Sequence, residues 1–209
     1  MSLILPRYPE TSRFVLVGDH PAIDFANTLP QTDDGPRENL GTWSDVLDWL
    51  AAVGLANADL DFTLETDEAQ TLQRIRQFRA EWKAELESLL AGQTVREKFL
   101  RSLNRMLAED STHDCLVENG DRSFHLVSSP SRLDGEKLVF AILARQIALF
   151  LAGANLEYLR RCANTESCVL YFYDTTKNHR RQWCSAASCG NRHKVAAFRQ
   201  RHARSKEAK

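Results

Sequence analysis

The chain has 209 residues and a mass of 23.8 kDa, enough for one ordinary domain and a small appended module. Hydrophobic residues make up 43% of it and charged residues 26%, which excludes wholesale disorder. The formal net charge of -1 hides a division: residues 158–209 carry 12 Lys and Arg against 3 Asp and Glu, and residues 1–157 carry 15 against 25. An acidic body therefore precedes a strongly basic tail.

No apolar run approaches the roughly 18 residues that a membrane-spanning helix needs. The first residues, MSLILPRYPE, contain too few apolar residues for a secretion signal. We therefore expect a cytoplasmic protein with no membrane partner.

Apolar periodicity predicts a mainly α-helical N-terminal domain, residues 1–157. Helices are expected over residues 43–53 with Gly54 as the stop, from Thr66 as N-cap to Gly92, after a capping box at Thr94–Glu97, and from about Leu133 to Leu159. Between the last two, residues 114–128 indicate a small β-hairpin, with Asn119-Gly120 as a tight two-residue turn. Since no Gly/Ser/Pro-rich linker follows, residues 158–209 should be docked on this domain.

Four of the five cysteines fall within 28 residues, as Cys162-x5-Cys168-x15-Cys184-x4-Cys189. Four thiolates close a tetrahedral shell around one structural zinc ion, and such a cluster without a secretion signal favours a metal site over disulfides. The alternatives are four unligated thiols, and His193 as a ligand in place of Cys189.

Between the cysteine pairs, residues 169–173 are typical of a strand, residues 174–178 of a turn, and Gln182-Trp183 of the returning strand. A last helix is expected from Asn191 to about Arg201. We expect its apolar residues to pack on the hairpin: Val195, Ala196 and Phe198. This order predicts a treble-clef-like zinc module at residues 158–209.

Trp183-Cys184-Ser185, followed by Cys189-Gly190-Asn191-Arg192 and Lys194, resembles the CGNR zinc finger family. Gly18, the run Ile23–Thr28 and the helix at Trp43–Leu50 are similar to the ABATE domain that precedes this finger. The resemblance covers nearly the whole chain. It implies a stress-induced transcription regulator that has DNA as its partner.

A dense set of cations accompanies the cysteines: Arg180, Arg181, Arg192, Lys194, Arg199 and Arg201. Such a set suits contacts to DNA phosphates. The last helix would place Asn191, Arg192 or His193 at base edges, unless these residues brace the finger instead. In the alternative interpretation, the cations make the finger a protein-interaction module that docks on an acidic surface, such as the body of its own or another subunit.

Polar residues in the N-terminal part suggest a small-molecule effector pocket: Asp24, Asn27, Thr28 and Arg79. The same residues would serve equally as helix caps or turn braces. The body is thus expected to sense a ligand or to form a homodimer. An enzyme that uses Asp24 and Asn27 is the third hypothesis, which the lack of a nucleophile motif, a Gly-rich phosphate loop and an open metal site disfavours.

Overall fold

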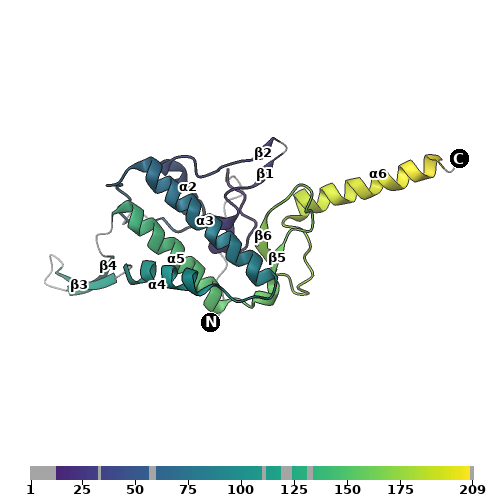
Figure 1. Cartoon of the computed structure of the whole chain (residues 1–209). Helices are drawn as coiled ribbons and strands as arrows, with labels where there is room; N and C mark the ends of the chain where they lie inside the picture. Colours follow the sequence, from purple (N-terminus) through teal and green to yellow (C-terminus); the bar gives the residue numbers. More distant parts are fainter. Residues whose placement is uncertain are drawn as a thin grey trace.

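The computed structural model describes residues 13–32, 34–56, 60–109, 112–118, 124–130 and 134–207. Figure 1 shows a helical body and a smaller module from which the last helix projects. Within the described stretches, no helix is both long and apolar enough to cross a bilayer. The predicted fold class, mainly helical with small hairpins and a C-terminal cysteine module, is confirmed.

The helices of the body are α1 (Pro21–Ala26), α2 (Trp43–Ala52), α3 (Glu68–Leu90), α4 (Glu97–Glu109) and α5 (Gly135–Gly153). The strands form three antiparallel pairs: β1 (Gln31–Thr32) with β2 (Gly35–Pro36), β3 (Thr112–Glu118) with β4 (Phe124–Pro130), and β5 (Leu159–Arg161) with β6 (Tyr171–Tyr173). The last helix is α6 (Asn191–Glu207).

The short helix α1 lies at the centre of the body, where every one of its residues is buried. His20 caps it, since its Nδ1 accepts a hydrogen bond from the Ala22 N–H, and Pro21 occupies the first turn, where no N–H partner is needed. Helices α3 and α5 and strand β6 surround it. The Trp82 indole of α3 donates a 2.7 Å hydrogen bond to the Ala22 carbonyl.

Helix α3 begins one residue later than the sequence indicates. Asp67 is its N-cap and accepts a hydrogen bond from the Gln70 N–H. The Thr66 hydroxyl, predicted to fill that role, instead donates to Glu136 of α5 at 3.0 Å. Two adjacent capping residues are equivalent in sequence, and a tertiary partner decides between them.

Helix α4 does not use the predicted capping box, because its first residue is Glu97. The buried carboxylate of Glu85 on α3 accepts hydrogen bonds from the backbone N–H of Arg96 at 3.0 Å and from its Nε at 2.6 Å. In a capping box the Glu97 side chain would accept a hydrogen bond from the Thr94 N–H, but here it pairs with Arg101. A carboxylate from another helix thus takes the place of Thr94.

The predicted hairpin is confirmed as β3 and β4, whose register pairs Thr112 with Pro130 and Glu118 with Phe124. Asn119 and Gly120 themselves lie outside the described residues.

Helix α5 ends at Gly153, six residues before the predicted end at Leu159. A 3₁₀ turn follows at Leu156–Tyr158, and Leu159 opens β5 opposite Tyr173. Leu159 is 1% exposed and packs in the core of the body. Burial in a sheet thus ends an apolar pattern that by itself would fit a longer helix.

Strand β6 pairs with β5. The prediction that this strand forms a hairpin with Gln182-Trp183 is therefore wrong. The strand belongs to two cores, because side chains alternate across a strand. Tyr171 and Tyr173 face the body, while Phe172 packs among the cysteines. This shared strand docks the module on the body, as the lack of a linker predicts.

Candidate zinc centre and nucleic-acid interface

The four clustered cysteines come from two places in the module. Cys162 and Cys168 lie in the loop between β5 and β6. Cys184 lies two residues before a π-helical turn at Ala186–Gly190, and Cys189 lies within that turn. All four are buried, and their sulfur atoms lie within 4.8 Å of one another. Four sulfurs placed about 2.3 Å from a tetrahedral zinc ion lie about 3.8 Å apart. The Sγ atoms of Cys168 and Cys184, at 3.7 Å, already have this spacing.

The electrostatics of the cluster also call for a cation. The hydrogen bond from the Cys184 thiol lowers the pKa of Cys168 to about 5, which favours a thiolate there. The same contact and burial raise the pKa of Cys184, because a second thiolate would lie against the first. A divalent cation removes this repulsion, so the residues fit one structural zinc ion with no open position.

Nearby donors orient the sulfur atoms. The Cys184 N–H points to the Cys162 Sγ at 3.4 Å, and the Asn164 amide points to the Cys189 Sγ at 3.7 Å. Asn164 also donates to Ser167 at 2.8 Å, which closes the five-residue gap of the first pair into a turn. Such contacts around the ligands hold a metal site in shape.

His193 lies outside this cluster, since its ring packs on Trp183 at 4.6 Å between centroids. It therefore does not replace Cys189 as a ligand, and its exposed ring lies against Trp183 rather than on the outer face of the helix. Asn191 and Arg192, the other two residues considered for base contacts, are both exposed.

The predicted effector-pocket residues instead build the joint between body and module. The Asn27 side chain donates to the Tyr171 carbonyl at 2.8 Å and accepts from the Tyr171 N–H at 2.9 Å, which continues the edge of β6. Asp24 accepts the Gly18 N–H at 2.7 Å, and the Gly18 carbonyl accepts the Tyr173 N–H at 2.9 Å. A Cβ at Gly18 would lie 2.8 Å from Ile23, so this approach requires glycine.

The other two predicted pocket residues are also braces. Thr28 donates to the Phe25 carbonyl at 2.8 Å and accepts from Arg79 at 3.0 Å, and Arg79 forms an ion pair with Glu38. The structure therefore corrects the effector pocket at Asp24, Asn27, Thr28 and Arg79: their polar atoms hold the chain together, and none of them lines the three cavities described below.

Arg181 is a brace as well. Its guanidinium pairs with Asp19, donates to the carbonyls of Val17 and Cys184, and lies 4.3 Å over the Phe172 ring. Its N–H donors point to partners inside the protein, so the structure removes Arg181 from the predicted DNA contacts. It joins the N-terminal segment to the cysteine loop instead.

The remaining predicted DNA contacts, Arg180, Arg192, Lys194, Arg199 and Arg201, are all exposed. Four of them lie on α6, which extends six residues beyond the predicted end and does not pack on the hairpin. Val195 is 39% exposed and Phe198 is 54% exposed, and Figure 1 shows α6 projecting away from the body. The predicted packing of these apolar residues is wrong, since the helix meets the module only at its first turns.

The side chains of α6 form three rows, since successive residues turn by about 100° around a helix. Val195, Phe198 and His202 share one stripe, which we call the apolar stripe. Arg192 and Arg199 form a row along one side of it, and Lys194 and Arg201 form a row along the other, each about 80° away. His193 is on the opposite face, against Trp183, so the apolar stripe points away from the module.

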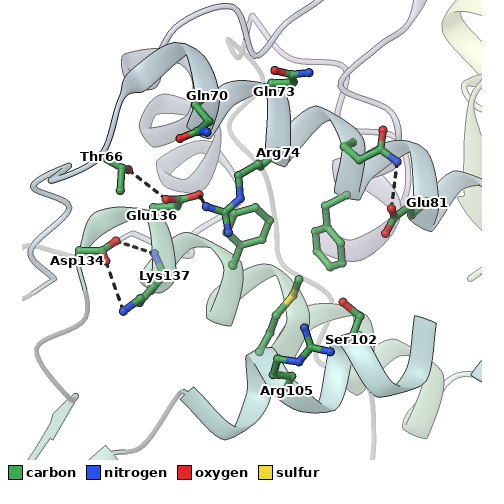
Figure 2. A pocket seen from close by; sticks show the side chains of 14 residues that line it. Thr66, Gln70, Gln73, Arg74, Glu81, Ser102, Arg105, Asp134, Glu136 and Lys137 are labelled. Carbon is green, nitrogen blue, oxygen red and sulfur yellow. Dashed lines mark hydrogen bonds and ion pairs between the residues drawn. The ribbon is translucent and has the colours of Figure 1, made fainter. Parts of the chain in front are cut away.

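A cavity of about 830 Å³ lies between α3, α4 and the start of α5 (Figure 2). Sequence reasoning missed it, because its residues on α3 repeat at helical spacing and are indistinguishable from a solvated face: Gln70, Gln73, Arg74, Gln77 and Glu81. Two smaller cavities, of about 540 and 370 Å³, both border Trp183 in the module.

Comparison with family models finds a match for each of the two parts of the chain. The ABATE model, described as "Putative stress-induced transcription regulator", matches residues 19–154, and the CGNR zinc finger model matches residues 158–202. No match is found among curated proteins. With most of its length matched by the first model and its buried cysteines within the second, the chain belongs to the ABATE family and carries a C-terminal CGNR zinc finger.

Proposed function

We propose that this protein is a DNA-binding transcription regulator, cytoplasmic and active in a stress response, in which the zinc finger presents α6 to DNA. The observation that carries this proposal is the arrangement of α6: an exposed apolar stripe with one row of cations on each side. A helix that is exposed on nearly all faces gains little from its own fold and requires a partner.

The major groove of B-DNA, about 12 Å wide, admits a single α-helix between two phosphate backbones. With the apolar stripe toward the bases, the two cationic rows approach one backbone each. Val195 and Phe198 then meet the apolar methyl groups of thymine, while the guanidinium and ammonium groups supply sequence-independent affinity.

The zinc site gives the helix a fixed base. Cys189 and Gly190 lie directly before α6, and the Trp183 ring packs on His193 in its first turn. Arg181 ties the same loop to Asp19 of the body. We infer that the metal sets the direction in which α6 leaves the module.

The body supplies the regulatory part, by binding an effector or by forming a homodimer. We propose no enzymatic activity, because Asp24 and Asn27, the residues of the enzyme hypothesis, are buried and hold backbone groups of Gly18 and Tyr171.

Fluorescence anisotropy with a labelled random duplex, titrated at several salt concentrations, tests the proposal. The wild type should bind at low salt, and the double variant Lys194→Gln/Arg201→Gln should reduce the slope of log K against log salt by about 2. The matched control Lys98→Gln/Arg101→Gln removes two exposed cations from α4 and should leave the slope unchanged.

Phe198→Ala separates the apolar stripe from the cations. It should weaken binding by about tenfold with an unchanged salt slope, because no phosphate contact is lost. Absence of DNA binding by the zinc-loaded protein even at low salt would overturn the proposal.

One observation favours a second candidate, docking of the finger on an acidic protein surface: the body of the same chain has 25 Asp and Glu against 15 Lys and Arg in residues 1–157. Because α6 projects away from its own body, such docking would join two copies. Sedimentation at low and high salt distinguishes the candidates, since this docking predicts a dimer that salt dissociates and that Lys194→Gln/Arg201→Gln abolishes.

A further inference from the structure

We propose that the cavity between α3, α4 and α5, here called the three-helix cavity, binds a small organic molecule with one anionic group and an apolar ring. Its volume of about 830 Å³ lies within the range of small-molecule sites, about 300–1,000 Å³. It lies on the body, and none of the α6 residues or cysteines lines it (Figure 2).

The apolar part of the cavity consists of Phe78, Met106 and Phe140, one residue from each of the three helices. The rings of Phe78 and Phe140 meet edge to face at 5.7 Å, and the Arg74 guanidinium lies 5.6 Å from the centre of the Phe140 ring. A flat apolar group thus finds aromatic and thioether contacts from three sides.

Most charges of the cavity are already paired. The buried carboxylate of Glu136 lies 2.7 Å from Arg74 and accepts the Thr66 hydroxyl, and the Lys137 ammonium lies 3.8 Å from Asp134 (Figure 2). Glu81 accepts a hydrogen bond from Gln77 at 3.0 Å. Within the described part of the chain, no carboxylate forms an ion pair with Arg105, which lines the cavity and is exposed.

Arg105 therefore selects the charge of the ligand. A guanidinium binds a carboxylate through two parallel hydrogen bonds. Glu81, Asp134 and Glu136 would repel a polyanion such as a nucleotide polyphosphate, so a single negative charge fits best. With the carboxylate at Arg105, the ring reaches Met106 next to it and then the two phenylalanines.

Helix α3 connects this cavity with the zinc finger. Its other end carries Glu87, which accepts a 2.5 Å hydrogen bond from the Tyr171 hydroxyl of β6 and lies 3.3 Å from Arg161 of β5. A ligand that shifts α3 would therefore act on the strands that hold the finger. This regulatory consequence rests on the proposed function, whereas binding in the cavity does not.

The two methionines of the chain, Met1 and Met106, allow a direct test. In the full-length zinc-loaded protein labelled with [methyl-¹³C]methionine, phenylacetate should shift the Met106 signal saturably and leave the Met1 signal unchanged. Phenethylamine has the same ring with a positive charge and should bind at least tenfold more weakly. Met106→Leu assigns the signal.

Arg105→Gln should weaken phenylacetate binding by about tenfold, while Arg101→Gln, one turn earlier on α4 and outside the cavity, should not change it. No saturable Met106 shift at millimolar phenylacetate overturns the site, and equal binding of phenethylamine or an unchanged affinity of Arg105→Gln overturns the anionic class. The samples contain no DNA, so failure of DNA binding leaves this result intact and failure here leaves the DNA titration intact.

Discussion

At the residue scale, the polar residues near the N-terminus show how sequence chemistry leaves a choice open. Asp24, Asn27 and Thr28 have the donors and acceptors of a ligand pocket and equally of a brace. In the structure, Asn27 bonds to the backbone of Tyr171 and Asp24 accepts the Gly18 N–H, so these side chains act as braces and their hydrogen bonds are not free for a ligand. Tyr171 is 144 residues from Asn27 in the chain, a separation that local pattern does not bridge.

His20 provides a testable consequence of burial. It is 5% exposed beneath Phe150, and burial lowers its pKa from 6.5 to about 4. Between these two pH values the unfolded chain binds a proton that the folded chain does not, so stability should fall as the pH falls from 6.5 toward 4. The loss across this window is on the order of 3 kcal/mol.

The measurement is urea unfolding at several pH values in this window, compared with His20→Asn. Asparagine retains an N-cap acceptor and does not titrate, so its stability should be nearly constant above about pH 5, where most carboxylates remain ionised. Equal pH dependence in wild type and variant would contradict the assignment to His20.

At the scale of elements, α4 illustrates a local signal that a distant group replaces. Thr94→Ala should change the free energy of unfolding by less than about 0.5 kcal/mol, because Thr94 does not cap α4. Glu85→Gln should cost about 2 kcal/mol, since the buried Glu85 holds the backbone N–H and the guanidinium of Arg96.

Chemical denaturation of the two variants provides the measurement, and each serves as the control for the other. A loss of about 1 kcal/mol for Thr94→Ala, the usual cost of a removed N-cap, together with a neutral Glu85→Gln, would show that the local capping box forms after all.

Helix α6 and the end of α5 show two opposite errors of the same reasoning. Apolar periodicity extends α5 through Leu159, because the pattern of apolar residues does not distinguish a short buried strand from another turn of a buried helix. In α6, periodicity correctly finds a helix, but it assigns Val195 and Phe198 to the protein's own core. Periodicity reports that a face is apolar and does not identify the partner of that face.

At the scale of the whole molecule, body and finger share one structure through β6, with Tyr171 and Tyr173 in the core of the body and Phe172 among the cysteines. Removal of zinc with a chelator should therefore destabilise the body as well as the finger. A loss of about 2 kcal/mol would lower the midpoint of thermal unfolding of a chain of this size by about 4–8 °C.

Tryptophan fluorescence of a Trp183→Phe variant monitors the body alone, since the other three tryptophans, Trp43, Trp49 and Trp82, lie there. Cys184→Ser should lose the metal and reproduce the shift, while Cys115→Ser, which changes the cysteine that is distant in sequence from the other four, should retain stoichiometric zinc. An unchanged midpoint after complete removal of zinc would show that the two parts unfold independently.

The sequence by itself determined the fold class, most helices, the four sulfur ligands and the division of charge, because helical periodicity, cysteine spacing and composition are local or additive properties. The tertiary structure alone decided the partner of β6, the caps of α3 and α4, the internal role of Arg181, the three-helix cavity and the direction of α6. Each of these depends on which groups meet across large separations in the chain. The sequence identifies a hydrogen-bond donor or an apolar face, whereas the packing of the whole chain determines which group it contacts.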